Sequence, residues 1–135
     1  MTNIMEFLLA RLDDEEAIAN NALHPDATEP GVWMTEHHNS KFHDEPDTCH
    51  IAEDRAGHYW TVASEVFIPN AEHMAHHDPA RVLRDVAAKR AVIDALMEIP
   101  AEHGTDAGFR AIGKSIPVMA AVYSDHPDYQ KEWAL

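Results

Sequence analysis

The sequence contains a single cysteine, Cys49, among its 135 residues. An intramolecular disulfide is therefore impossible, and the chain has no need of an oxidising compartment. Long apolar runs are also missing: residues 7–10 and 118–123 are among the longest, whereas a membrane-spanning helix needs about 20 residues. The first basic residue is Arg11, so the positively charged start of a signal peptide is absent. We expect a cytoplasmic protein.

Basic residues are scarce. The chain has 10 Lys and Arg against 24 Asp and Glu, a net charge of −14. Residues 1–78 carry 3 basic and 16 acidic residues, whereas residues 79–135 carry 7 and 8. Such a field repels nucleic acid and anionic membranes, and it favours cations or a basic protein partner. Two other interpretations stay open: a surface that only keeps the protein soluble, and an acidic imitation of DNA.

The size and apolar content predict one domain over residues 1–135. A chain of this length buries about two-thirds of the surface that its unfolded form exposes. Its 45% apolar content is typical of soluble globular proteins.

Three helices are predicted in the first hundred residues. Asn3 followed by Glu6 is typical of a reciprocal helix cap, and apolar residues then recur at helical spacing, which predicts a helix over 3–23. Pro69 precedes a short helix over 71–77. Asp78 and Pro79 are favoured residues for a cap and a first helical position, so a long helix is predicted over 79–97.

The region 32–68 is predicted to be loop and β structure. Residues 32–34 are consistent with a short strand, followed by a mobile loop that carries His37, His38 and His43. A β-hairpin is predicted around residues 53–57, with Gly57 in a longer turn. Residues 101–116, with three glycines, are predicted as a loop, and 117–135 as a helix and tail. The expected fold is α+β, with the first and long helices packed together beside a β-hairpin or three-strand meander.

A candidate metal site follows from the histidines. His73 and His77 are four residues apart, so on a helix they share a face and could chelate a divalent cation. Cys49, His50 or His58 from the hairpin could supply the two further ligands, and thiolate with imidazole would select zinc. The alternative is structural: His77 ends one helix, and Asp78 caps the next.

The acidic run Asp13, Asp14, Glu15 and Glu16 is a candidate interaction surface. Its structural alternative is a solvated helix face. Arg90 interrupts the apolar stripe of the long helix and needs an acidic partner there, for which Glu16 is the obvious choice. An anion or partner site built from Lys89 and Arg90 is the other possibility.

Three blocks resemble a known family. Residues 7–17 resemble the opening segment of that family, and residues 120–133 resemble its closing segment. The central block is His73-Met74-Ala75-His76-His77-Asp78-Pro79-Ala80-Arg81-Val82-Leu83-Arg84. All three blocks are similar to domain of unknown function 6221, a family found in actinobacteria and their phages. The resemblance implies no activity. Many members carry cysteines between the long helix and the closing segment, but residues 101–117 contain none. A zinc site imagined from those cysteines therefore cannot be carried onto this chain.

Catalytic motifs are missing, since no serine lies in a nucleophile elbow and no glycine loop could cradle phosphate. The leading hypothesis is a non-enzymatic binding or regulatory protein, an accessory of a phage or its host, whose acidic half meets a basic protein. The rival hypothesis is a zinc-type metal protein or hydrolase that uses His73 and His77 with Cys49 or His50.

Overall fold

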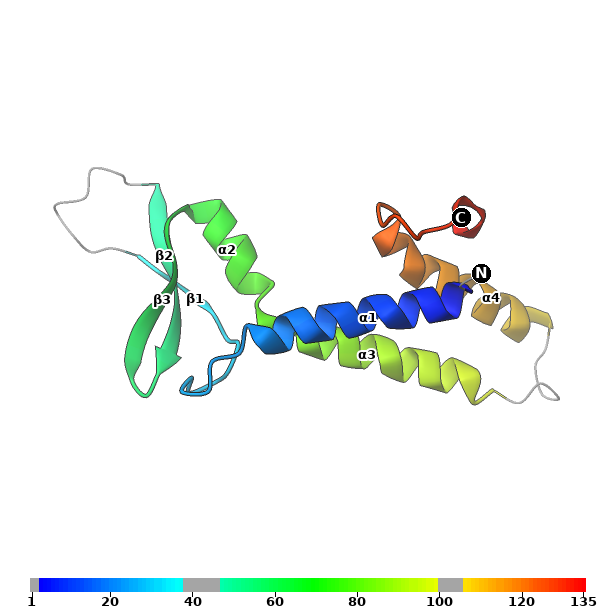
Figure 1. Ribbon diagram of the computed structural model, residues 1–135, viewed down its shortest axis with the longest axis horizontal. Helices are drawn as coiled ribbons and strands as arrows, with labels where there is room; N and C mark the ends of the chain where they lie inside the picture. The colour runs from blue at the N-terminus through cyan, green and yellow to red at the C-terminus, as the bar shows by residue number, and fades with distance from the viewer. Residues whose placement is uncertain (1–2, 38–46, 100–105) are drawn as a thin grey trace. The chain divides into compact units, whose positions relative to one another are not determined.

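The computed structural model describes residues 3–37, 47–99 and 106–135. In chain order they form α1 (Ile4–Asn21), β1 (Met34–Glu36), β2 (Thr48–Arg55), β3 (His58–Phe67), α2 (Ile68–His76), α3 (Pro79–Met97) and α4 (Asp106–Ala120), then the 3₁₀ turns η1 (Ala121–Tyr123) and η2 (Lys131–Trp133) (Figure 1). The predicted α+β class and three-strand meander are confirmed. None of the helices within these ranges has the length and apolar character to cross a membrane.

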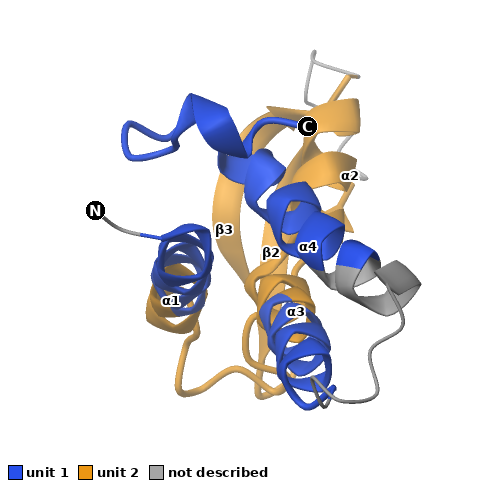
Figure 2. Ribbon diagram, turned by 90° about the vertical axis from the view of Figure 1, so that its right-hand side faces the viewer, with its two compact units in different colours: residues 1–16, 86–135 blue, residues 17–85 orange. Residues whose placement is uncertain are grey.

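The chain divides into two compact units, coloured separately in Figure 2. Unit 1 comprises Met1–Glu16 and Val86–Leu135, and unit 2 comprises Ala17–Asp85. Both α1 and α3 run through the boundary between them. The prediction of one domain over 1–135 stays a prediction.

In unit 1, α1 begins with the predicted reciprocal cap. The Glu6 N–H donates to Asn3 Oδ1 at 2.9 Å, and the Asn3 N–H donates to Glu6 Oε2 at 3.1 Å. These bonds satisfy backbone donors that the first helical turn would otherwise leave unpaired. The helix ends at Asn21, just before the predicted end at 23.

The C-terminal tail packs on α1 through a cluster of rings around Phe7. The Phe7 ring, 2% exposed, lies 5.1 Å from that of Trp133 and 5.9 Å from that of Tyr129, measured between centroids. His126 completes this side, with its ring 5.6 Å from Phe7 and its Nε2 2.7 Å from Arg11 Nη1. The tail is therefore an integral part of unit 1.

Unit 2 is built on an antiparallel sheet in the order β1-β2-β3. Alternate residues of β2 point to opposite faces of the sheet, and Cys49 and Ile51 are fully buried together with Ala71 of α2. Trp33, Ala63, Val66 and Ile68 pack against this cluster. Arg55 pairs with His58, so β2 and β3 join through Ala56 and Gly57 alone, both with positive φ of 54° and 84°. The predicted five-residue turn is therefore wrong: a two-residue turn with positive φ at both positions matches the twist of the strands.

A segment between α1 and β1 crosses over the start of α3 at Gly31. A Cβ at Gly31, whose φ is +78°, would lie 2.6 Å from Leu23 Cδ2 and 3.0 Å from the Ala80 nitrogen, so only glycine fits. The Gly31 carbonyl accepts a hydrogen bond from the Ala80 N–H at 3.1 Å. Its own N–H donates to Oε1 of Glu53, a carboxylate only 2% exposed. Glu53 therefore ties the crossing segment to the sheet.

The remaining sequence predictions have mixed outcomes. α3 spans 79–97 as predicted, whereas α2 begins at Ile68 rather than at 71, and β1 begins at Met34 rather than at 32. The loop predicted over 101–116 is wrong from residue 106 onward, because α4 occupies Asp106–Ala120. Gly113 lies in this helix with no neighbouring atom within 4 Å of where a Cβ would be, and Ile116 and Ala120, one turn apart, are buried. Burial of that stripe outweighs the weak helix propensity of glycine. The loop predicted to carry His38 and His43 lies outside the described residues.

Candidate functional site

The junction between α2 and α3 has the predicted capping arrangement. Asp78, 7% exposed, accepts from the Arg81 N–H through Oδ1 at 2.7 Å and from the Trp33 N–H through Oδ2 at 3.2 Å. The His77 N–H donates back to the carbonyls of His73 and Met74, which ends α2. Asp78 therefore starts α3 and at the same time holds the segment before β1 in place.

The predicted pair of histidines comes together at this junction. The ring centroids of His73 and His77 are 4.4 Å apart, and His76 Nε2 lies 2.5 Å from Arg81 Nη1. The pKa of His77 is lowered below its ordinary value of 6.5. The largest cause is partial removal of its ring from water, and the charges of His73, Arg81 and His76 contribute less. The His77 ring therefore stays neutral at physiological pH, the form in which imidazole binds a metal.

Two of the other predicted ligands, Cys49 and His50, have neighbours of their own in unit 2. Cys49 is buried against Ala71, which is two residues before His73 and so on a different side of α2. Burial and the charge of Glu72 raise the pKa of the Cys49 thiol above its usual 9.0. His50 Nδ1 accepts from the Glu65 N–H at 3.3 Å. In the described ranges no three His, Cys, Asp or Glu side chains gather as a metal site, so the four-ligand site stays a prediction.

The acidic run 13–16 of α1 forms ion pairs within unit 1. Arg90 contacts both Asp13 and Glu16, the latter at 3.2 Å, which confirms the expected pairing of Arg90 with Glu16. The hydrogen bond from Arg90 to Asp13 is the main cause that raises the pKa of Arg90 above its usual value.

The other two carboxylates of the run also have basic neighbours. Lys89 Nζ lies 3.9 Å from Glu15 Oε2, and Arg11 Nη2 lies 2.9 Å from Asp14 Oδ2. Much of the charge of 13–16 is therefore balanced locally. Asp13, Glu15 and Glu16 pair with basic residues of α3, whereas Asp14 pairs with Arg11 within α1.

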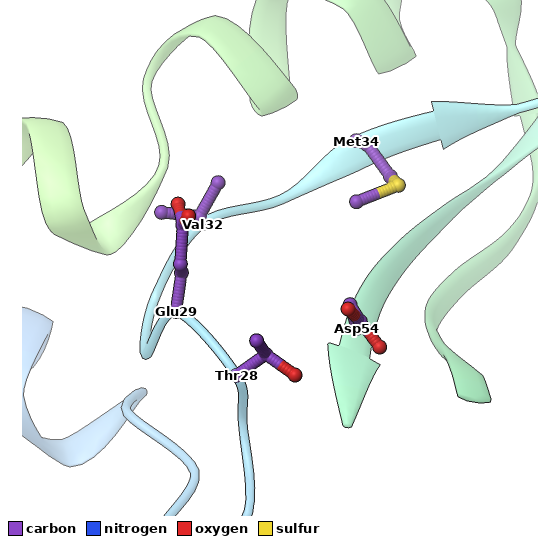
Figure 3. Close-up of a pocket in the computed structure, with 5 residues that line it drawn as sticks. All are labelled: Thr28, Glu29, Val32, Met34 and Asp54. Atoms are coloured by element: carbon purple, nitrogen blue, oxygen red, sulfur yellow. The ribbon is translucent and has the colours of Figure 1, made fainter. Parts of the chain in front are cut away.

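Two other carboxylates, Glu29 and Asp54, line a cavity of about 160 Å³ in unit 2. It is lined by Thr28, Glu29, Val32, Met34 and Asp54. Figure 3 shows Thr28 and Met34 directed into the space between the segment before β1 and the end of β2, where Asp54 lies. We call this space the acidic cavity. Its volume is roughly ten times that required by a single water molecule and below that of typical small-molecule pockets, which suits one inserted side chain.

Hydrogen bonds fix the walls of the acidic cavity. The Thr28 N–H donates to the Asp54 carbonyl at 2.9 Å, and the Ala56 N–H donates to Thr28 Oγ1 at 3.2 Å. Asp54 Oδ1 accepts from the Gly57 N–H at 2.8 Å. Across the ranges with assigned structure, no Lys or Arg side chain forms an ion pair with Glu29 or Asp54. The Asp54 carboxylate is therefore positioned in advance for a cation.

Sequence reasoning did not find this cavity. Thr28 and Asp54 are 26 positions apart and share no motif or periodicity. The only signal in the sequence was Pro30-Gly31, which marked a turn but did not show where that turn would fold.

The chain belongs to DUF6221, a family of unknown function, which matches it over residues 1–135. This confirms the resemblance drawn from the sequence. No curated protein and no solved structure matches the chain.

Proposed function

We propose that this protein is a non-enzymatic binding protein whose unit 2 recognises a basic protein partner. The acidic cavity is the observation that carries the proposal. Glu29 and Asp54 supply carboxylates for an ammonium or guanidinium group, and Val32 and Met34 supply an apolar wall for its aliphatic stem.

The distribution of charge supports the same assignment. Residues 17–85 contain 12 Asp and Glu but only 4 Lys and Arg, a net charge of −8. Such a surface attracts a basic protein and increases its association rate, in a manner that salt weakens. The acidic run 13–16 contributes less to recognition, because its carboxylates already contact Arg11, Lys89 and Arg90.

A hexaarginine peptide tests the proposal by isothermal titration calorimetry at low salt. The double variant Glu29→Gln/Asp54→Asn removes two charges from the cavity but keeps a side-chain oxygen at position 54 for the Gly57 N–H. Its matched control, Asp14→Asn/Glu15→Gln, removes two charges from unit 1. Because hydrogen bonds to charged groups contribute about 1.5–3 kcal/mol, the cavity variant should bind at least about tenfold more weakly than the control. If both variants bound hexaarginine equally weakly, the peptide would be responding to net charge and not to the acidic cavity.

Metal binding at His73 and His77 is a second candidate, favoured by the 4.4 Å between their rings. Two imidazoles bind zinc weakly unless other groups complete the site. Untagged protein should then contain metal that disappears in the His73→Ala/His77→Ala variant. Metal content unchanged by this substitution would exclude the pair. The accessory role in a phage or its bacterial host stays a prediction from the family resemblance.

A further inference from the structure

A second cavity in unit 2 lies beside the turn between β2 and β3. It measures about 620 Å³ and is lined by His24, Asp26, Arg55, Ala56 and Trp60. This volume falls within the range of pockets that bind small organic molecules. We call it the Arg55–Trp60 cavity. We propose that it binds a neutral purine of the guanine type, as the free base or nucleoside.

The wall of this cavity is built on the rigid hairpin. Glu53 pairs with Trp60 across β2 and β3, and Arg55 follows Glu53 by two residues, so all three side chains share one face of the sheet. Arg55 Nε donates to Glu53 Oε2 at 3.2 Å, and the Arg55 guanidinium carbon lies 5.4 Å from the Trp60 ring centroid. The Arg55 guanidinium is thus held in one orientation by a buried carboxylate and an indole ring.

The polar groups of the cavity call for a ligand with both acceptors and donors. Since Glu53 engages the Nε of Arg55, the two terminal nitrogens can donate to a pair of ligand acceptors. Asp26 uses only its N–H within the described structure, donating to His24 Nδ1 at 3.2 Å, and its carboxylate can accept from ligand donors. Trp60 is 56% exposed, so the part of its ring that the Arg55 guanidinium leaves uncovered offers aromatic surface for stacking.

Guanine carries these groups on one planar system of two fused rings. Its O6 and N7 are a pair of acceptors that suit an arginine, and its N1–H and 2-amino groups are adjacent donors that suit a carboxylate. Adenine presents an acceptor, N1, in place of the N1–H donor, so its ring nitrogen would face the Asp26 carboxylate unfavourably. The preference should therefore be for guanine over adenine.

Charge favours a neutral ligand over a nucleotide or nucleic acid. Unit 2 has a net charge of −8, and Glu53 neutralises Arg55 at 3.2 Å. A phosphate would therefore meet a repulsive field. Guanosine monophosphate should bind no more tightly than guanosine, and single-stranded RNA should not bind.

The test is a titration of ¹⁵N-labelled protein with guanosine, adenosine and inosine, followed through the Trp60 indole N–H. Guanosine should bind at least about tenfold more tightly than adenosine. Inosine, which lacks the 2-amino group, should lie between them. Trp60→Ala and Asp26→Asn should each weaken guanosine binding about tenfold. This matches the roughly 1–3 kcal/mol that base stacking and paired base contacts contribute. In the Trp60→Ala variant, the Gly57 amide replaces the indole N–H as the reporter.

Tyr59→Ala is the matched control, because Tyr59 is a neighbouring aromatic residue of β3, 62% exposed, that points to the opposite face. It should leave guanosine binding unchanged. Trp60→Phe should retain part of the affinity, which separates lost stacking from lost folding. Four results would each overturn the proposal. They are no shift of the Trp60 indole N–H at millimolar guanosine, adenosine binding as tightly as guanosine, guanosine monophosphate binding more tightly than guanosine, and an equal loss of guanosine affinity in Tyr59→Ala.

Discussion

Replacing the buried carboxylate Glu53 with alanine should destabilise unit 2 severely. The substitution removes the acceptor for the Gly31 N–H at 3.1 Å and for Arg55 Nε at 3.2 Å. Gly31 is buried, and the Arg55 side chain is 22% exposed, so neither donor recovers full contact with water. Removing one partner of a buried ion pair costs about 3–5 kcal/mol. We expect a loss in this range, which lowers the melting temperature by about 10–20 °C for a protein of this size.

The assay is urea unfolding followed by tryptophan fluorescence in a Trp133→Phe background, so that only Trp33 and Trp60 of unit 2 report. Glu53→Gln is the control: its amide oxygen can still accept from Gly31, but the charge facing Arg55 is lost, so the expected cost is about 1–2 kcal/mol. A loss below about 1 kcal/mol for Glu53→Ala, or equal losses for both variants, would refute the role of Glu53 in joining the crossing segment to the sheet.

Three further predictions concern the tail, the histidine pair and the thiol. Phe7→Ala should lower the free energy of unfolding by about 3–5 kcal/mol, because Phe7 is 2% exposed and surrounded by rings of the tail. Chemical denaturation followed by Trp133 fluorescence measures this loss. A loss under about 1 kcal/mol would show that the tail does not pack there. Since the pKa of His77 is lowered in the folded state, the unfolded chain binds more protons below pH 6.5, and stability should fall as pH decreases from 6.5 through the folded pKa. His77→Gln should reduce this fall in pH-dependent melts, and a His77 NMR titration midpoint at or above 6.5 would contradict the reasoning. Because burial and Glu72 raise the pKa of Cys49, iodoacetamide should alkylate it slowly at about pH 8 and rapidly in urea, as followed by mass spectrometry; rapid reaction of the folded protein would contradict its burial.

Local signals in the sequence predicted local structure well. The cap at Asn3 and Glu6, the Asp78 cap and the bounds of α3 depend on residues within one helical turn of each other. The pairing of Arg90 with Glu16 spans 74 positions, yet it could be predicted because a cation in an apolar stripe requires an acidic partner.

Failures arose where packing decided the outcome. The glycines of 101–116 predicted a loop, but the apolar stripe ending in Ile116 and Ala120 supports α4. Local patterns also did not show that Ala71 of α2 packs against Cys49, and the metal site stays a prediction. The acidic cavity depends on hydrogen bonds between residues 28 and 54–56, which no local pattern encodes.

The most direct test of the proposed function is a map of where a basic peptide binds. Hexaarginine added to ¹⁵N-labelled protein should shift the amides of Thr28, Glu29, Met34 and Asp54, and high salt should reverse these shifts. Amides of the paired run 13–16 should shift far less. Shifts centred on 13–16, or spread evenly over both units, would contradict recognition through the acidic cavity.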